Sequence, residues 1–275
     1  NLKMGPNASF VGANANRFVV TSGEAGAGGI TKEYASAEEF VFPLGVDGYT
    51  PATLWFSSEP TTFGAITVVP VNFEHPATSV KGSSLSYFWR VKSDGFGGID
   101  GKVRSRFSYR QGNVAGNEDG YVPAVFQYDQ SDWQRGTTND IDRDNNLINS
   151  WTSISSILDG DYTAGLSESF DKPTKFYSRG SGFWRDAANW STAGHAGTQA
   201  TRIPSSGDIV VIGNGHRIAL GREDMPKPSG WNRNNENPNT DVQNSALLQI
   251  EEGAVLDVTF NQLSSFGMVV NHPNG

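Results

Sequence analysis

The stretch that most constrains the fold begins near Phe176, where two tryptophans flank a compact turn and a β-branched run follows. Trp184 and Trp190 are the tryptophans, and the apolar runs are IVVI at residues 209–212 and RIAL at residues 217–220. The Gly-Asn-Gly-His segment between the runs favours a tight turn, because Asn and Gly both tolerate positive φ. The sequence therefore predicts a β-hairpin at this point.

Residues 40–170 repeatedly alternate apolar and polar side chains between turn signals. Such alternation at roughly ten-residue spacing, with Gly and Pro between the segments, predicts an Ig-like antiparallel β-sandwich. No part of this region carries a sustained helical period. The expected strands are residues 39–43, 52–57, 64–73, 84–91, 102–110 and 122–128.

The clearest period of two lies in residues 103–110, where Arg104, Arg106 and Arg110 share one side of the predicted strand. Three arginines on one strand face can bind an anionic glycan or a phosphate. A solvated outer face of the sandwich is the favoured interpretation, because antiparallel sheets commonly expose one polar face.

The last thirty or so residues change character, with short apolar runs separated by turns such as Glu-Glu-Gly. A short strand, a turn and another short strand are typical of a parallel β-solenoid, in which each coil covers the apolar face of the next. We therefore predict an all-β chain in which the sandwich is followed by the start of a right-handed parallel β-helix. The predicted parts are a strand-poor segment (1–34), alternatively the last coil of a preceding solenoid, a β-sandwich (35–172) and a β-helix-like part (173–275).

Composition limits the functional classes. The 275 residues suit one or two domains, and the net charge of -8 argues against nucleic-acid binding, which uses clustered Lys and Arg. The absence of cysteine removes disulfides and thiolate metal sites. No apolar stretch approaches the ~20 residues that span a bilayer. The chain lacks a signal peptide and does not begin with Met, so we expect a processed piece of a longer protein.

One acidic segment is a candidate metal site. Asp140, Asp142 and Asp144 alternate, and their carboxylates can converge on calcium. The EF-hand pattern fails, because Asn145 and Trp151 stand where it needs glycine and glutamate. A non-EF calcium loop remains open beside the default interpretation, a solvated turn rich in Asp and Asn.

Candidate residues for sugar binding are Trp133 and Trp231, whose rings can stack on a sugar if they are exposed; a lone aromatic is more often a loop anchor. No catalytic residues are predicted. The histidines (His75, His195, His216 and His272) lack ligand spacing, and no Gly-x-Ser-x-Gly turn precedes a helix.

Two blocks of sequence resemble parts of large surface and gliding-associated proteins of Bacteroidetes. FVVT at 18–21, FVFPLG at 40–45 and YFWRV at 87–91 are similar to a sandwich module of those proteins. FYS at 176–178, NWS at 189–191 and GDIVVI at 207–212 resemble the opening coils of their β-helical domains, and more distantly an eight-glycine domain family of eukaryotic β-helix proteins. The resemblance implies type IX secretion and a place at the cell surface, and it supplies no catalytic residue.

The leading functional hypothesis is a non-catalytic structural or adhesive module of a large exported surface protein. Its expected partners are other surface proteins, extracellular glycans or neighbouring repeats of the same polypeptide, with calcium as the one candidate cofactor. The alternatives are a carbohydrate-binding module and part of a polysaccharide-degrading β-helix enzyme.

Overall fold

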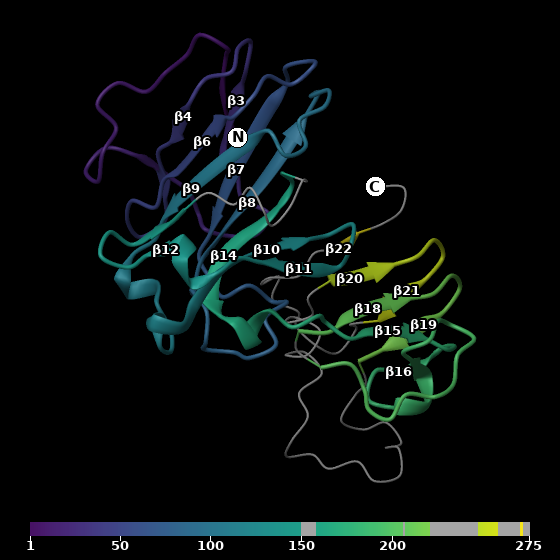
Figure 1. Ribbon diagram of the computed structural model, residues 1–275. Helices are drawn as coiled ribbons and strands as arrows, with labels where there is room; N and C mark the ends of the chain where they lie inside the picture. The colour runs from purple at the N-terminus through teal and green to yellow at the C-terminus, as the bar shows by residue number, and fades with distance from the viewer. Residues whose placement is uncertain (150–157, 206, 221–246, 258–269, 272–275) are drawn as a thin grey trace. The chain divides into compact units, whose positions relative to one another are not determined.

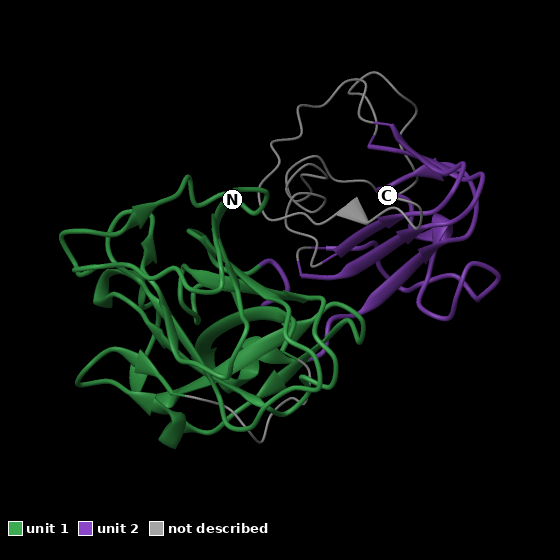
Figure 2. Ribbon diagram, turned by 90° about the horizontal axis from the view of Figure 1, so that it is seen from above, with its two compact units in different colours: residues 1–75, 80–171 green, residues 76–79, 172–275 purple. Residues whose placement is uncertain are grey.

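The computed structural model describes residues 1–149, 158–205, 207–220, 247–257 and 270–271 (Figure 1). Within these ranges the regular elements are strands and short 3-10 helices, so the all-β prediction is confirmed. No helix in the described ranges has the length and apolar character needed to cross a membrane. The chain divides into two compact units, residues 1–75 with 80–171 (unit 1) and residues 76–79 with 172–275 (unit 2) (Figure 2).

Unit 1 contains a seven-stranded sheet whose neighbours are antiparallel apart from one parallel pair at its edge, β1 with β3. Because β1 and β3 belong to this sheet, residues 1–34 lie within unit 1 and do not form a separate part. The order of strands is β1 (Leu2–Met4), β3 (Ile30–Glu33), β7 (Ala65–Val71), β8 (Phe88–Asp94), β14 (Gly160–Leu166), β10 (Tyr121–Gln127) and β11 (Asp132–Arg135).

A second sheet of unit 1 has five strands, all antiparallel to their neighbours. Its order is β12 (Ile141–Asp142), β13 (Leu147–Ile148), β9 (Val103–Ser108), β6 (Ala52–Phe56) and β4 (Phe40–Phe42). A short parallel pair, β2 (Val19–Val20) with β5 (Leu44–Gly45), completes the strands of this unit. The 3-10 helices are η1 (Gln111–Asn113), η2 (Glu118–Gly120), η3 (Thr138–Asp140) and η4 (Ser167–Phe170), with η5 (Ala187–Asn189) in unit 2.

Both sheets of unit 1 contribute side chains to one hydrophobic core. Trp89 of the larger sheet lies with its ring centroid 5.1 Å from that of Phe107 in the smaller sheet, and Phe107 lies 5.0 Å from Tyr162. The indole nitrogen of Trp89 donates to the carbonyl of Thr50, 2.9 Å away, so this large ring is buried without losing its polar contact. The Ig-like type of the sandwich stays a prediction.

The six strands expected between residues 39 and 128 are all present, and the fourth is shifted toward the C-terminus, to Phe88–Asp94. Sequence reasoning missed β14, which lies in the middle of the seven-stranded sheet. Its sequence, GDYTAGL, does alternate, but it contains two glycines and an aspartate, which are depleted in strands and weaken the signal.

Unit 2 is built from strands that pair mostly in parallel with strands about 30 to 40 residues further along the chain. One sheet has the order β17 (Trp190–Ser191), β15 (Lys175–Ser178), β18 (Ile209–Ile212), β20 (Leu247–Ile250) and β22 (Val270–Asn271), with only β17 antiparallel to its neighbour. The other has the order β16 (Gly182–Phe183), β19 (Arg217–Ala219) and β21 (Val255–Asp257), all parallel.

The predicted hairpin at residues 209–220 is wrong, because β18 and β19 belong to different sheets. The turn between them exists, with the His216 amide donating to the carbonyl of Gly213. Each strand, however, hydrogen-bonds to strands from other parts of unit 2. The turn residues specify a change of direction, and the choice of partner depends on residues far along the chain.

The two tryptophans that constrained the sequence interpretation lie at the centre of the unit 2 core. Trp184 and Trp190 are 0% exposed, and their ring centroids are 5.0 Å apart. The indole nitrogen of Trp190 donates to the carbonyl of Trp184 at 2.8 Å, which closes the compact turn around η5. The apolar side of β18 packs against them through Val210 and Ile212.

Polar side chains connect the turns of unit 2. The hydroxyl of Ser178, which is 0% exposed, accepts from the Gly213 amide at 2.8 Å and lies 2.7 Å from Nδ1 of His216. The carbonyl of Ser178 accepts from Nδ1 of His195 at 2.6 Å. His216 therefore has a hydrogen-bonding role within unit 2 in addition to its place at a turn exit.

Replacing Ser178 with alanine is expected to lower the free energy of unfolding of unit 2 by about 1–3 kcal/mol, because the buried Gly213 amide loses its acceptor. A matched control is Ser181→Ala, whose hydroxyl accepts from the exposed Arg217 amide, a group that water can solvate instead. Hydrogen exchange of the β18 amides measures both effects, and equal losses in the two variants would contradict this account.

Candidate functional site

The densest group of buried charges in the described chain lies on the face of the seven-stranded sheet that points away from the core. Along β14, Tyr162 and Ala164 enter the core, so Asp161 faces the opposite side, because successive side chains of a strand alternate. Asp161 is paired in register with Arg90 of β8 on one side and with Phe126 of β10 on the other. Three central strands therefore position this group.

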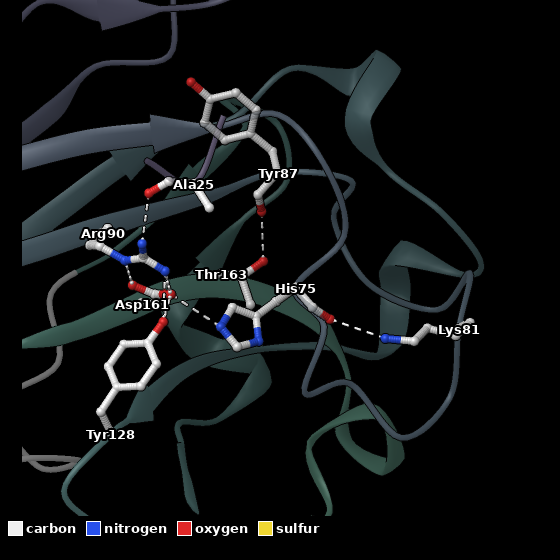
Figure 3. Close-up of polar contacts among 8 residues, drawn as sticks. All are labelled: Ala25, His75, Lys81, Tyr87, Arg90, Tyr128, Asp161 and Thr163. Carbon is white, nitrogen blue, oxygen red and sulfur yellow. Dashed lines mark hydrogen bonds and ion pairs between the residues drawn. The ribbon is translucent and has the colours of Figure 1, made fainter. Parts of the chain in front are cut away.

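Asp161 accepts hydrogen bonds from three side chains (Figure 3). Arg90 binds it in a bidentate manner, with Nε 2.9 Å from Oδ1 and Nη2 2.7 Å from Oδ2. The Tyr128 hydroxyl donates to Oδ2 at 2.5 Å, and Nε2 of His75 lies 3.2 Å from the same oxygen. We call these four residues the Asp161 network.

Further contacts connect the Asp161 network to distant parts of unit 1 (Figure 3). The remaining Nη1 of Arg90 donates to the carbonyl of Ala25 at 2.8 Å, and its Nη2 also donates to the Tyr128 hydroxyl at 2.7 Å. The ammonium group of Lys81 donates to the carbonyl of His75 at 3.3 Å. The network therefore holds a loop from the first thirty residues and the segment after β7 against the sheet.

Burial and the Arg90 charge together set the protonation of the network. Burial alone would raise the pKa of Asp161, but the charge of Arg90 and the donated hydrogen bonds hold that pKa well below its usual range. Burial lowers the pKa of His75 despite its hydrogen bond to Asp161. Burial, with the Asp161 charge second, raises the pKa of Tyr128 well above its usual value. At neutral pH the network therefore holds one anion and one cation, with a neutral imidazole and phenol.

The tautomer of His75 follows from its partner. A carboxylate can only accept, so the neutral ring carries its hydrogen on Nε2 and donates it to Asp161. Aromatic rings surround the imidazole, with centroids of Phe88 and Trp133 at 4.8 Å and of Phe126 at 5.1 Å. A neutral imidazole suits this apolar setting better than a charged one.

An aspartate beside a histidine is the pairing used in general base catalysis, but that role requires contact with a substrate. The side chain of Asp161 is 0% exposed and that of His75 is 1% exposed. Both oxygens of Asp161 already accept hydrogen bonds from the protein. The geometry is therefore that of a buried, satisfied ion pair that joins strands and loops.

The pKa direction of His75 predicts a loss of stability in mild acid. Because its pKa is lower in the folded state, the unfolded chain binds the additional proton once the pH falls below about 6.5. Stability is therefore complete above that pH and is lost, at up to ~1.4 kcal/mol per pH unit, as the pH falls toward the lowered value. Asp161, whose pKa is also lowered, contributes a separate loss only below about pH 4.

Urea denaturation between about pH 7 and pH 5 covers the pH range of the His75 effect and stays above the range in which Asp161 contributes. The unfolding free energy of the wild type should decline more steeply than that of His75→Gln, which cannot titrate at this position. Only the slope is compared, since the substitution also removes ring contacts. Parallel slopes would show that His75 does not titrate as inferred.

The three predicted calcium ligands are not arranged as a metal site in the structure. Asp140 caps η3, accepting from the amide and hydroxyl of Thr137 at 2.8 and 3.0 Å. Asp142 accepts from the amide and side chain of Asn145 at 3.1 and 2.8 Å, and Asp144 is exposed. Among the residues that the structure describes, no three His, Cys, Asp or Glu side chains are arranged to hold a metal ion.

Trp133 is 6% exposed, and its ring packs against those of His75, Phe126 and Phe170. This burial corrects the prediction of a sugar-binding role, because no open face of the indole remains for a sugar. The second predicted residue, Trp231, lies outside the described residues.

Sequence reasoning did not single out Arg90 or Asp161 and treated His75 as a scattered histidine. The available signal was one charge of each sign inside two strand-like segments, FWRV at 88–91 and GDYT at 160–163. Comparison of the chain with protein-family models, curated proteins and solved structures gives no match. Functional inference therefore depends on the side chains themselves.

Proposed function

We propose that this chain is a non-catalytic structural and adhesive module of a large exported cell-surface protein. In this proposal unit 1 is a two-sheet β-sandwich, and unit 2 forms the opening coils of a right-handed parallel β-helix. The resemblance to Bacteroidetes surface proteins supports type IX export and a surface location. Other surface proteins, extracellular glycans and neighbouring repeats of the same polypeptide are the proposed partners.

The non-catalytic part of the proposal is supported by the Asp161 network, whose carboxylate oxygens already accept hydrogen bonds from the protein. The network is a group of buried charges, and these charges are used in contacts among Arg90, Tyr128 and the carboxylate. A general acid or base needs a position that a substrate can reach. A buried ion pair of this kind instead fixes which strands and loops meet.

The pairing in unit 2 supports the β-helix part of the proposal. Phe176 pairs with Val210, and Val210 pairs with Leu248, so equivalent positions of three successive strands lie side by side. All three side chains belong to one core. Stacks of this kind bury a continuous core and form elongated, stiff bodies, which suits a spacer or display element.

Antibodies against the chain test the location on intact cells that produce the protein. We expect surface labelling that disappears when external protease is applied, and labelling seen only after lysis would contradict the proposal. Incubation of the purified chain with a panel of polysaccharides tests the enzyme alternative. Release of reducing or unsaturated sugar ends would favour a polysaccharide-degrading enzyme over an adhesive module.

A further inference from the structure

The five-stranded sheet of unit 1 exposes a cationic face on the side away from the core. Leu54 and Phe107 point into the core, so Trp55 on β6 and the neighbouring arginines Arg104 and Arg106 on β9 point outward. Trp55 is paired in register with Arg104. We call Trp55, Arg104 and Arg106 the β6–β9 surface.

The two arginines of this surface have no carboxylate partner among the described residues. Strands β4, β6 and β9 contain no acidic residue, and the nearest acidic residue within a strand of this sheet is Asp142 on β12, two strands beyond β9. Arg135, Arg143 and Arg217 each form an ion pair. The exposed Arg17, Arg110 and Arg179 form none with the described residues, as is the case for Arg104 and Arg106. Arg104 donates through Nη1 to the carbonyl of Gly101 at 3.5 Å, which leaves its charge uncompensated. A chain of net charge -8 thus places two neighbouring positive charges on one face of this sheet.

Arg110, the third arginine of the predicted stripe, has a different role. Its Nη1 donates to the carbonyl of Asp47 at 2.7 Å, so it holds a loop of unit 1. Arg106 instead lies beside the indole of Trp55, with its guanidinium carbon 5.8 Å from the ring centroid. Trp55 is partly exposed, so the face combines an aromatic ring with two guanidinium groups.

We propose that the β6–β9 surface binds an acidic polysaccharide, a polymer that carries carboxylate or sulfate groups along a sugar chain. The inference rests on the proposed adhesive function and names its ligand class. Arg104 and Arg106 are two residues apart on one strand, which places their Cα atoms roughly 6.7 Å apart. Guanidinium groups bind carboxylate or sulfate through paired N–H donors, and an indole ring packs on the apolar face of a sugar.

A sparsely charged sugar chain fits this surface better than a nucleic acid. Nucleic-acid binders use long grooves of Lys and Arg with several aromatic platforms, because one charge per nucleotide must be matched along the strand. The β6–β9 surface offers two cations and one ring, and the net charge of -8 disfavours a long, dense polyanion. Nucleic acid is therefore an outcome that the test must exclude.

Binding of the full chain to hyaluronan, which carries one carboxylate per disaccharide, and to a lightly sulfated dextran tests the proposal, with neutral dextran as the blank. We expect retention by at least one acidic polymer, weakened as ionic strength rises from about 0.05 M to about 0.3 M. Arg104→Gln with Arg106→Gln should weaken that binding roughly tenfold, and Trp55→Ala should weaken it several-fold. These side chains lie outside the core, so melting temperatures should remain close to that of the wild type.

The matched control is Lys3→Gln with Lys92→Gln, which removes two exposed positive charges from the other sheet of unit 1. It should bind as the wild type does. The proposal is overturned if neither acidic polymer binds, if the arginine pair can be replaced without loss, or if the control loses affinity equally. It is also overturned if oligothymidine binds as tightly as the acidic sugars. If the chain labels the cell surface but binds neither acidic polymer, the proposed ligand class is wrong and the proposed adhesive module is unaffected.

Discussion

Replacing Asp161 with asparagine is expected to lower the free energy of unfolding of unit 1 by about 3–5 kcal/mol, the cost of leaving a buried charge without its partner. Arg90 is only 13% exposed and would keep its positive charge. The amide cannot reproduce the carboxylate's contacts in either orientation. Its NH2 group would face the Nε donor of Arg90 on one side, or the three donors that converge on Oδ2 on the other.

The matched control is Asp171→Asn, which removes the same charge from an ion pair on the surface. Asp171 is 67% exposed and lies 3.4 Å from Arg135, so its loss should cost at most about 1 kcal/mol. Hydrogen exchange of the β10 and β14 amides reports on unit 1 and is suited to a chain with two units. A cost below about 1 kcal/mol for Asp161→Asn would contradict the structural role of the network.

A double variant then separates the cost of leaving Arg90 unpaired from the cost of losing the Asp161 contacts themselves. Arg90→Met combined with Asp161→Leu removes both charges, and such replacements of buried ion pairs are often close to neutral. We expect the double variant to be more stable than Asp161→Asn alone. The difference measures the cost of the unpaired charge, and a double variant that is less stable than the single one would point to roles beyond the ion pair.

The second large effect is expected in unit 2, where Trp190→Ala should cost about 3–5 kcal/mol. The substitution empties a fully buried site and removes the hydrogen bond to the Trp184 carbonyl. Because this core is small, we expect the loss to remove protection from the β15 and β18 amides in hydrogen exchange. Retained protection in both strands would contradict the central role of this ring.

Two phenylalanine variants refine the prediction. The indole nitrogen of Trp190 has an acceptor, whereas that of Trp184 is buried without a hydrogen-bond partner among the described residues. Trp190→Phe therefore loses a hydrogen bond worth about 1 kcal/mol, and Trp184→Phe removes an unsatisfied donor. Trp190→Phe should be the more destabilising of the two, and the reverse order would show that ring volume decides the outcome.

Local patterns predicted the strands of unit 1 well because alternation reports which face is buried. Residues 103–110 alternate clearly, and the observed strand Val103–Ser108 lies inside that range. β14 was missed because Gly160, Asp161 and Gly165 are residue types depleted in strands, although the segment alternates. The burial of Asp161 and Thr163 on its outward face depends on contacts with other segments. Alternation indicates a strand with one polar face, but it does not show that other segments bury that polar face.

Pairing and long-range contacts were the harder part. His75 and Asp161 are 86 residues apart, and no local pattern brings them together. The wrong hairpin has the same cause, since a tight turn is compatible with two strands that pair with each other or with separate neighbours. The burial of Trp133 could not be predicted from its neighbours in sequence, because it depends on Phe170, which lies on a different element.

The central claim is that the paired buried charges of the Asp161 network serve the fold and not binding, and that the exposed β6–β9 surface carries the binding. Its most direct test measures affinity for an acidic polysaccharide and melting temperature on the same variants, at a temperature where all are folded. Asp161→Asn should keep its affinity and melt roughly 10 °C lower, whereas Arg104→Gln with Arg106→Gln should lose affinity at an unchanged melting temperature. Loss of affinity in folded Asp161→Asn, with binding intact in the arginine variant, would contradict the account.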